Sequence, residues 1–173
     1  MDETPSTTRP TSPIPHQEGP TIGPKNLHTG QTVAASFTIQ ESGGPRAVVY
    51  SVRLDSYDPI KGTYRISDPD PDPISLESEW DVSPDDIVDY IAPRQDALEV
   101  GTMVYALFNL ARVGKRREMS TEFYTAEIKK VLSEGRKGLR YYVHYPDEPG
   151  NLSVVYPGEI FPMSEGKWSK SIQ

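Results

Sequence analysis

Three aspartates that alternate with prolines form the stretch of this sequence best suited to bind a ligand. They are Asp68, Asp70 and Asp72, and the prolines that separate them lack an amide hydrogen and fix the backbone φ angle. The stretch therefore cannot continue a β-ladder or begin a helix. Because carboxylates this close repel one another, we expect either a solvated acidic loop or a loop that holds a cation.

The residues just before the acidic stretch place it at the end of a strand. Tyr64 and Ile66 alternate with the polar Arg65 and Ser67, the period-two pattern of a half-buried strand. The first carboxylate, Asp68, follows directly.

A second set of candidates is aromatic. Phe108, Tyr124 and Tyr145 each share the strand parity of apolar neighbours, so alternation turns all three rings toward the same side of a sheet. Each also lies at a predicted strand end, beside a turn. These rings are either ordinary core aromatics or the walls of an open box.

An aromatic box is suited to a methylated ammonium. Ring faces attract a cation, and methylation removes the hydrogen-bond donors that would otherwise need partners. One desolvated contact of this kind contributes about 2 kcal/mol, or roughly thirty-fold in affinity.

The acidic stretch and the three aromatic residues must be positioned by short strands that turn residues separate. In the first half we expect strands near 32–37, 47–54, 64–67, 80–82 and 87–91, with a helical turn as the alternative for 81–86. The second half repeats this plan: 101–106 resembles 30–34, 142–147 resembles the strand with the acidic end, and 160–162 resembles 91–93. Such self-similarity predicts a duplicated unit, and short strands in this number favour a small bent β-barrel.

The predicted fold is therefore all-β, with two tightly packed five-stranded barrels. We expect a disordered Pro/Thr/Ser-rich tail over 1–29, the first barrel over 30–95, the second over 96–164, and a C-terminal tail over 165–173.

Composition excludes several classes of function. The 173 residues carry a net charge of −7, which argues against nucleic acid or an anionic membrane as the main partner. Cysteine is absent, which excludes disulfides and cysteine-based metal sites, and three histidines make a zinc site improbable. Without a membrane span or signal peptide, a cytosolic or nuclear protein is expected. No nucleophile motif or phosphate-binding glycine loop occurs, so an enzyme is not expected.

The acidic stretch and the aromatic set together resemble the SAGA-associated factor family, whose tandem Tudor domain (two SH3-like barrels) reads methylated histone tails. The resemblance covers about 30–163 and rests on four stretches in order: 64–72, 104–108, 121–126 and 142–148. It implies binding of the histone H-three N-terminus with di- or trimethylated lysine at the fourth position, within a SAGA-like histone acetyltransferase complex in the nucleus.

The resemblance also implies roles for particular residues. Phe108, Tyr124 and Tyr145 match the methyl-lysine cage, and Asp68 and Asp70 match the pocket for the free α-amino group, with Asp147 and Asp72 as auxiliary acidic residues. No cofactor or metal is implied.

The chain also departs from the family. Phe108 replaces the commoner tyrosine, the family's N-terminal coiled coil is missing, and the insertion 109–119 is long and basic. We expect the insertion to be a solvated loop. The alternative is nucleosomal DNA contact through four basic residues: Arg112, Lys115, Arg116 and Arg117.

Three other functions stay open. The rings can accept methyl-arginine, because its planar guanidinium also stacks on aromatic faces. A small barrel can bind RNA, although acidity weighs against it. The acidic loop can bind calcium as an EF-hand would, with Glu79 at the twelfth position, but Pro73 occupies the place where that loop needs glycine.

Overall fold

The chain is all-β in the computed structural model, which describes residues 20–70, 78–92, 96–111, 115–133, 138–148 and 150–166. Within these ranges the helical elements are the three-residue 3-10 turns η3 (Pro84–Asp86) and η5 (Met163–Glu165). The all-β prediction is confirmed, and the helical turn expected as an alternative over 81–86 is present as η3.

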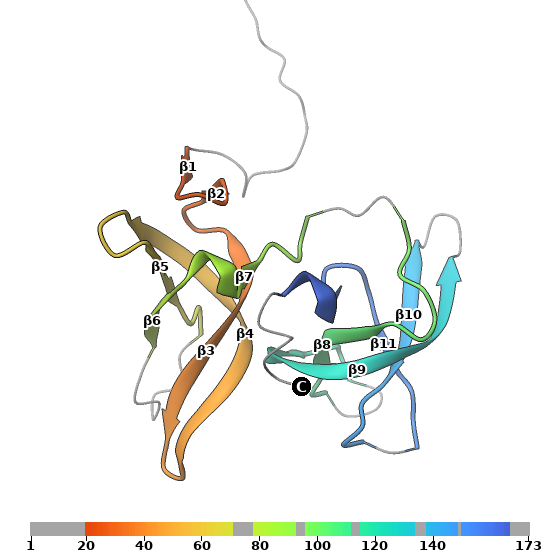
Figure 1. Cartoon of the computed structure of the whole chain (residues 1–173). Coiled ribbons are helices and arrows are strands. Elements are labelled where there is room, and N and C mark those ends of the chain that lie inside the picture. Colours follow the sequence, from red (N-terminus) through yellow and green to blue (C-terminus); the bar gives the residue numbers. More distant parts are fainter. Residues whose placement is uncertain are drawn as a thin grey trace, which may run out of the picture.

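The strands fall into a short N-terminal pair and two units of five strands each, which Figure 1 shows side by side. The N-terminal pair is β1 (Thr21–Ile22) and β2 (Leu27–His28). The first unit comprises β3 (Thr32–Glu41), β4 (Gly44–Asp58), β5 (Thr63–Ser67), β6 (Glu79–Val82) and β7 (Ile87–Val88). The second unit comprises β8 (Met103–Asn109), β9 (Met119–Ser133), β10 (Leu139–His144), β11 (Ser153–Val155) and β12 (Ile160–Pro162).

Both units have the same antiparallel strand order. The first unit runs β7–β3–β4–β5–β6, and the second runs β12–β8–β9–β10–β11, so in each the fifth strand pairs with the first. Among the described residues no ladder joins the fourth strand to the fifth. Each unit is thus an open, curled sheet, and the closed barrels expected from the sequence are not found.

Equivalent hydrogen bonds begin the two units. The Gly30 N–H donates to Leu54 O (2.7 Å), and the Gly101 N–H donates to Ile128 O (2.8 Å). Both glycines have positive φ, 88° and 94°, which a residue without Cβ adopts at little cost. The sequence similarity between 30–34 and 101–106 therefore reflects the same local structure.

The third strands are also equivalent. A β-bulge lies between Leu54 and Ser56 in the first unit and opposite the Tyr142–Val143 step in the second. Tyr64 and Tyr141 hold equivalent places next to these bulges. The Lys25 N–H donates to the Tyr64 hydroxyl and the Leu98 N–H to the Tyr141 hydroxyl, both at 3.0 Å. The predicted duplication is thus seen in register and hydrogen bonding.

Each unit encloses its own apolar core on one face of its strands. In the first unit the alternating side chains of β3 and β4 meet those of β5 to β7: Val33, Ala35, Val52, Leu54, Tyr64, Ile66, Val82 and Ile87. The corresponding core of the second unit consists of Val104, Ala106, Ala126, Ile128, Tyr141, Val143, Tyr145, Val155 and Ile160.

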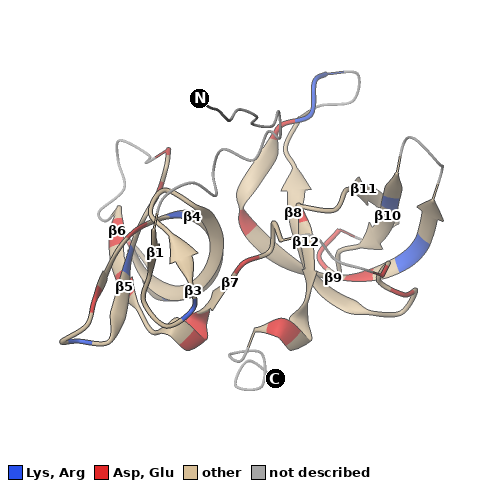
Figure 2. Cartoon of the chain, turned by 90° about the horizontal axis from the view of Figure 1, so that it is seen from above, with Lys and Arg blue, Asp and Glu red and all other residues tan. Residues whose placement is uncertain are grey.

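The opposite faces of the same strands form a third core that joins the units. It contains Ala34, Val49, Val88, Tyr90, Tyr105, Leu107, Phe123 and Phe161, all buried. One ladder pair, Tyr50 with Glu122, also connects β4 to β9. Because burial on both faces leaves these strands no solvent-exposed side near the junction, the two units pack as one body (Figure 2).

Two details differ from the sequence-based expectations. The sequence predicts a disordered tail that includes 20–29, but β1 and β2 lie there. The apolar side chain of Leu27 reaches the first core and is buried in it. The counterpart of Ile160 is Ile87, since each pairs with the equivalent alanine of the first strand; the predicted match of 160–162 to 91–93 is wrong. Residues 1–19 and 167–173 lie outside the described residues.

Candidate functional site

Three aromatic rings surround a pocket at one end of the second unit. Phe108 comes from β8, Tyr124 from β9, and Tyr145 directly follows β10. The Phe108 ring stands nearly perpendicular to both others: its centroid is 6.3 Å from that of Tyr124 (78°) and 5.2 Å from that of Tyr145 (79°). The structure thus brings together all three aromatic residues that the sequence singled out.

The three rings are held to different degrees. Tyr145 is 3% exposed, its hydroxyl donates to Leu107 O (2.5 Å), and burial raises the pKa of its phenol far above the ordinary value. The backbone N–H of Phe108 donates to Ser120 Oγ (2.9 Å). Tyr124, in contrast, is 41% exposed. The pocket therefore has a rigid floor at Tyr145 and an accessible wall at Tyr124.

The rim of this pocket is acidic and apolar. The pocket has a volume of about 330 Å³, and besides the three rings it is lined by Leu110, Thr125, Pro146, Asp147 and Glu148. Both carboxylate residues are exposed, and the described lining includes no basic side chain. Ring faces beneath two carboxylates give a site for a cation with apolar substituents.

The acidic stretch follows β5 as predicted. The Asp68 N–H donates to Ser78 O (2.9 Å), and Asp68 Oδ1 accepts the N–H of Asp70 (2.9 Å), so the two form a compact turn. Asp68 is half-buried and Asp70 is exposed. Neither carboxylate has a basic partner within the described residues, and Asp72 lies outside them.

The surroundings of the acidic stretch do not resemble those of an EF-hand. The stretch connects β5 to β6, whereas a calcium loop of that class lies between helices. The candidate twelfth ligand, Glu79, binds Arg65 at 3.1 Å. Among the described residues no three histidine, aspartate or glutamate side chains cluster as metal ligands.

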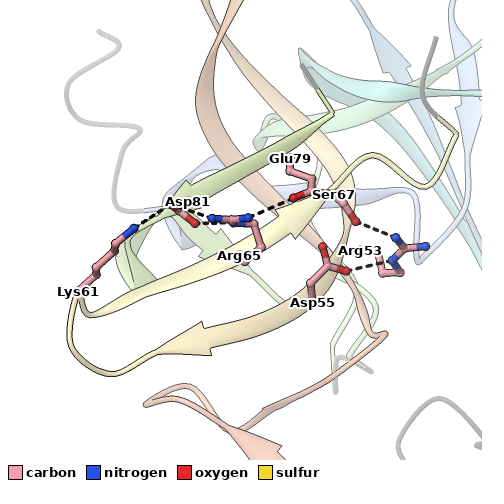
Figure 3. A network of polar contacts seen from close by, with 7 residues as sticks. All are labelled: Arg53, Asp55, Lys61, Arg65, Ser67, Glu79 and Asp81. Atoms are coloured by element: carbon pink, nitrogen blue, oxygen red, sulfur yellow. Dashed lines mark hydrogen bonds and ion pairs between the residues drawn. The ribbon is translucent and has the colours of Figure 1, made fainter. Parts of the chain in front are cut away.

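Two acidic side chains of β6 are neutralised by a network on the outer face of the sheet (Figure 3). Arg65 binds Asp81 at 2.6 Å as well as Glu79, and Lys61 lies 3.8 Å from Asp81. Hydrogen bonding to Arg65 holds the pKa of Asp81 below its usual value. Glu79 and Asp81 are thus paired, whereas Asp68 and Asp70, among the described residues of the β5–β6 connection, are carboxylates without a basic partner that can receive an outside cation.

A polar connection runs from β4 of the first unit to the aromatic pocket across the junction of the units. Glu122 of β9 lies opposite Tyr50 of β4, and its Oε1 is 3.4 Å from the Tyr124 hydroxyl. Its Oε2 accepts a 3.0 Å hydrogen bond from Arg46, which also binds Glu41 through two nitrogens.

The carboxylate of Glu122 affects the pKa of two tyrosines. Burial raises the pKa of Tyr50 and of Tyr124, and the charge of Glu122 adds to both shifts. The charge of Asp68 also contributes to the shift of Tyr50. Tyr50, Glu122 and Tyr124 therefore lie next to one another across the junction of the units.

The basic segment before β9 is less available than the sequence suggested. Arg117 donates to Val154 O, forms an ion pair with Glu159, and lies over the Tyr156 ring at 4.6 Å. Lys115 and Arg116 are exposed, and Arg112 lies outside the described residues. Because Arg117 fastens this segment to the loop before β12, it is a structural residue, and Lys115 and Arg116 are the exposed members of the predicted basic set among the described residues. Figure 2 shows basic residues gathered at the tip of this basic segment, above the second unit.

Sequence reasoning missed several residues around the pocket. Leu110, Thr125 and Glu148 line it, and Glu122 connects it to the first unit. Leu110 lies two residues after the stretch 104–108 and Glu148 is the last residue of the stretch 142–148, so their position beyond strand ends was the available signal. Glu122 had none, because its place depends on a pairing between units.

No family model matches the chain, and no curated protein is significantly similar to it in sequence. None of the helices among the described residues has the length and apolar character that a membrane span requires.

Proposed function

We propose that this chain reads the N-terminal tail of histone H-three and binds the lysine at its fourth position in the di- or trimethylated state. The observation that carries the proposal is the open pocket in which the Phe108 ring stands perpendicular to Tyr124 and Tyr145. A methylated ammonium inside it meets ring faces on three sides and the carboxylate of Asp147 at the rim.

The first unit supplies the second anchor. Asp68 and Asp70 hold the free α-amino group, a compact cation with three hydrogen-bond donors that carboxylates satisfy. The polar connection through Tyr50, Glu122 and Tyr124 supports a single peptide path between the two anchors. An internal methyl-lysine would leave the amine-binding carboxylates without a ligand, so two anchors also give specificity.

The wider assignment follows from the family resemblance. We propose that the chain is a non-enzymatic subunit of a SAGA-like histone acetyltransferase complex in the nucleus, as two linked Tudor-like modules. Contact with nucleosomal DNA through Lys115 and Arg116 is a secondary possibility within the same assignment, since both are exposed.

Calorimetric titration with tail peptides of graded methylation tests the proposal. Trimethylated peptide should bind at least tenfold more tightly than unmethylated peptide, and acetylation of the amino terminus should cost as much as the Asp68→Asn/Asp70→Asn double substitution. Equal affinity for all methylation states refutes the cage, and tighter binding of methyl-arginine peptides identifies that ligand instead.

A further inference from the structure

The first unit contains a counterpart of two cage rings. In the β3–β4 ladder Ala35 lies opposite Tyr50, and in the β8–β9 ladder Ala106 lies opposite Tyr124. Two residues further along the first strand of each unit come Phe37 and Phe108. The Phe37 and Tyr50 rings are 5.5 Å apart at 85°, close to the 6.3 Å and 78° of the Phe108–Tyr124 pair.

The third wall of the cage has a different counterpart. Arg53 pairs with Ser67 in the first unit, and Glu127 pairs with His144 in the second, at equivalent places on β4 and β9. The next residue in the chain is Asp68 in the first unit and Tyr145 in the second. A carboxylate therefore occupies the position where the cage has its third ring.

A further ring beside Phe37 comes from a different strand. Trp80 of β6 stacks on Phe37 with centroids 4.4 Å apart at 35°. This tilted stacking covers part of the Phe37 face. At the positions where the second unit has a box of three rings, the first unit therefore has a ring pair and one carboxylate.

The two kinds of ammonium need different surroundings. A free α-ammonium carries three N–H donors that must each find an acceptor when water is removed. A trimethylammonium has no donor and gains most from ring faces. An aspartate suits the first ligand, and a tyrosine suits the second.

We propose that the residue directly after the third strand selects the type of ammonium that each unit binds. Phe37 and Tyr50 form the walls of the amine site, and Asp68 makes that site specific for an unmethylated amine. Tyr145, in the equivalent position, makes the second site specific for a methylated one. This inference rests on the proposed function and adds the ring pair of the first unit to the amine site.

The test uses two tail peptides that both carry trimethylated lysine, one with a free α-amine and one with an N,N,N-trimethylated α-amine. Both termini are positively charged, so they differ in hydrogen-bond donors and in bulk but not in charge, and the Asp68 variants separate these two causes. The wild-type chain should prefer the free amine at least tenfold. Asp68→Asn should bring that ratio to about one, and Asp68→Tyr should bring it to one or below, with tighter binding of the trimethylated terminus than in Asp68→Asn.

Asp147→Asn is the matched control, because it removes an exposed carboxylate at the other pocket and should weaken both peptides equally. A wild-type ratio near one overturns the inference, as does a ratio that stays tenfold in Asp68→Asn. If Asp68→Tyr does not fold by circular dichroism, Asp68→Asn decides alone. A third peptide with unmethylated lysine separates the two proposals: loss of lysine-methylation dependence refutes the cage, whereas loss of the amine preference alone refutes the selection by Asp68. Failure of all three peptides to bind refutes both.

Discussion

Replacement of Tyr124 by alanine is the most direct test of the aromatic pocket. Tyr124 is 41% exposed, whereas the other two rings are largely covered by protein, so its removal opens one wall and leaves the floor in place. A cation seated against Phe108 and Tyr145 is mostly shielded from water, which places the lost contact near the upper end of the cation–π range. We expect a loss of about 1.4–2 kcal/mol, or roughly ten- to thirty-fold in affinity for the trimethylated tail peptide.

Two matched variants make the measurement specific. Tyr124→Phe keeps the ring and loses only a 3.4 Å hydrogen bond to Glu122, so affinity should stay within about twofold. Tyr142→Ala removes a tyrosine of β10 that lies against Lys130 and does not line the pocket. It should leave affinity unchanged.

The assay is calorimetric titration at one salt concentration, with thermal melting of each variant to verify the fold. Because Tyr124 is exposed at a strand position, its substitution should cost the fold no more than about 1 kcal/mol. Unchanged affinity in a folded Tyr124→Ala chain would refute the cage assignment, and so would an equal loss in Tyr124→Ala and Tyr142→Ala.

Three further predictions concern charged residues. Arg117→Ala should lower the free energy of unfolding by about 1 kcal/mol, a fall in Tm of roughly 2–4 °C, because Glu159 loses its ion pair; peptide affinity should not change. Arg65→Gln should destabilise the chain at neutral pH but not in acid. Hydrogen bonding to Arg65 holds the folded pKa of Asp81 below its ordinary value of 3.8. The stability that the Arg65–Asp81 pair contributes is therefore present above pH 3.8 and is lost as the pH falls through the lowered pKa. Glu122→Gln should weaken binding of the cationic tail by about two- to fivefold and reduce its salt dependence, since one carboxylate beside the peptide path is removed.

Each of these has a clear contrary result. A normal Tm in Arg117→Ala would mean that the basic segment is not fastened by this residue. A difference between Arg65→Gln and wild type that persists in melts at pH 2.5 would assign the effect to packing and not to Asp81. Tighter peptide binding in Glu122→Gln would place the peptide path elsewhere.

The sequence predicted strand positions better than it predicted how strands join. Alternation located β5 and β6 within one or two residues, because one face of each is buried and the other exposed. It underestimated β4, which continues beyond its apolar run because a ladder with two neighbours satisfies its backbone groups. Over the described residues, the structure does not show the closed barrels that the sequence predicted. Closure depends on the distances between strand ends, and the apolar periodicity of a sequence does not contain those distances.

The same distinction applies to the site. The strand parity of Phe108, Tyr124 and Tyr145 was enough to predict that their rings lie together, because the direction of a side chain along a strand is local information. The place of Glu122 depends on a pairing between β4 and β9, and the burial of Leu27 depends on how the chain enters the first unit. Neither could be inferred from neighbours in the sequence.

The Tyr50–Glu122 ladder pair and the apolar core behind it fix the distance between the two units. Since backbone hydrogen bonds and packed rings hold both units at one separation, the proposed amine site and the proposed methyl-lysine cage lie at a fixed distance from each other. Each added residue lengthens an extended chain by about 3.3 Å. Under the proposed function, a tail with one residue inserted before its modified lysine would reach only one of the two sites. The chain should then distinguish lysines by their distance from the terminus as well as by their methyl groups.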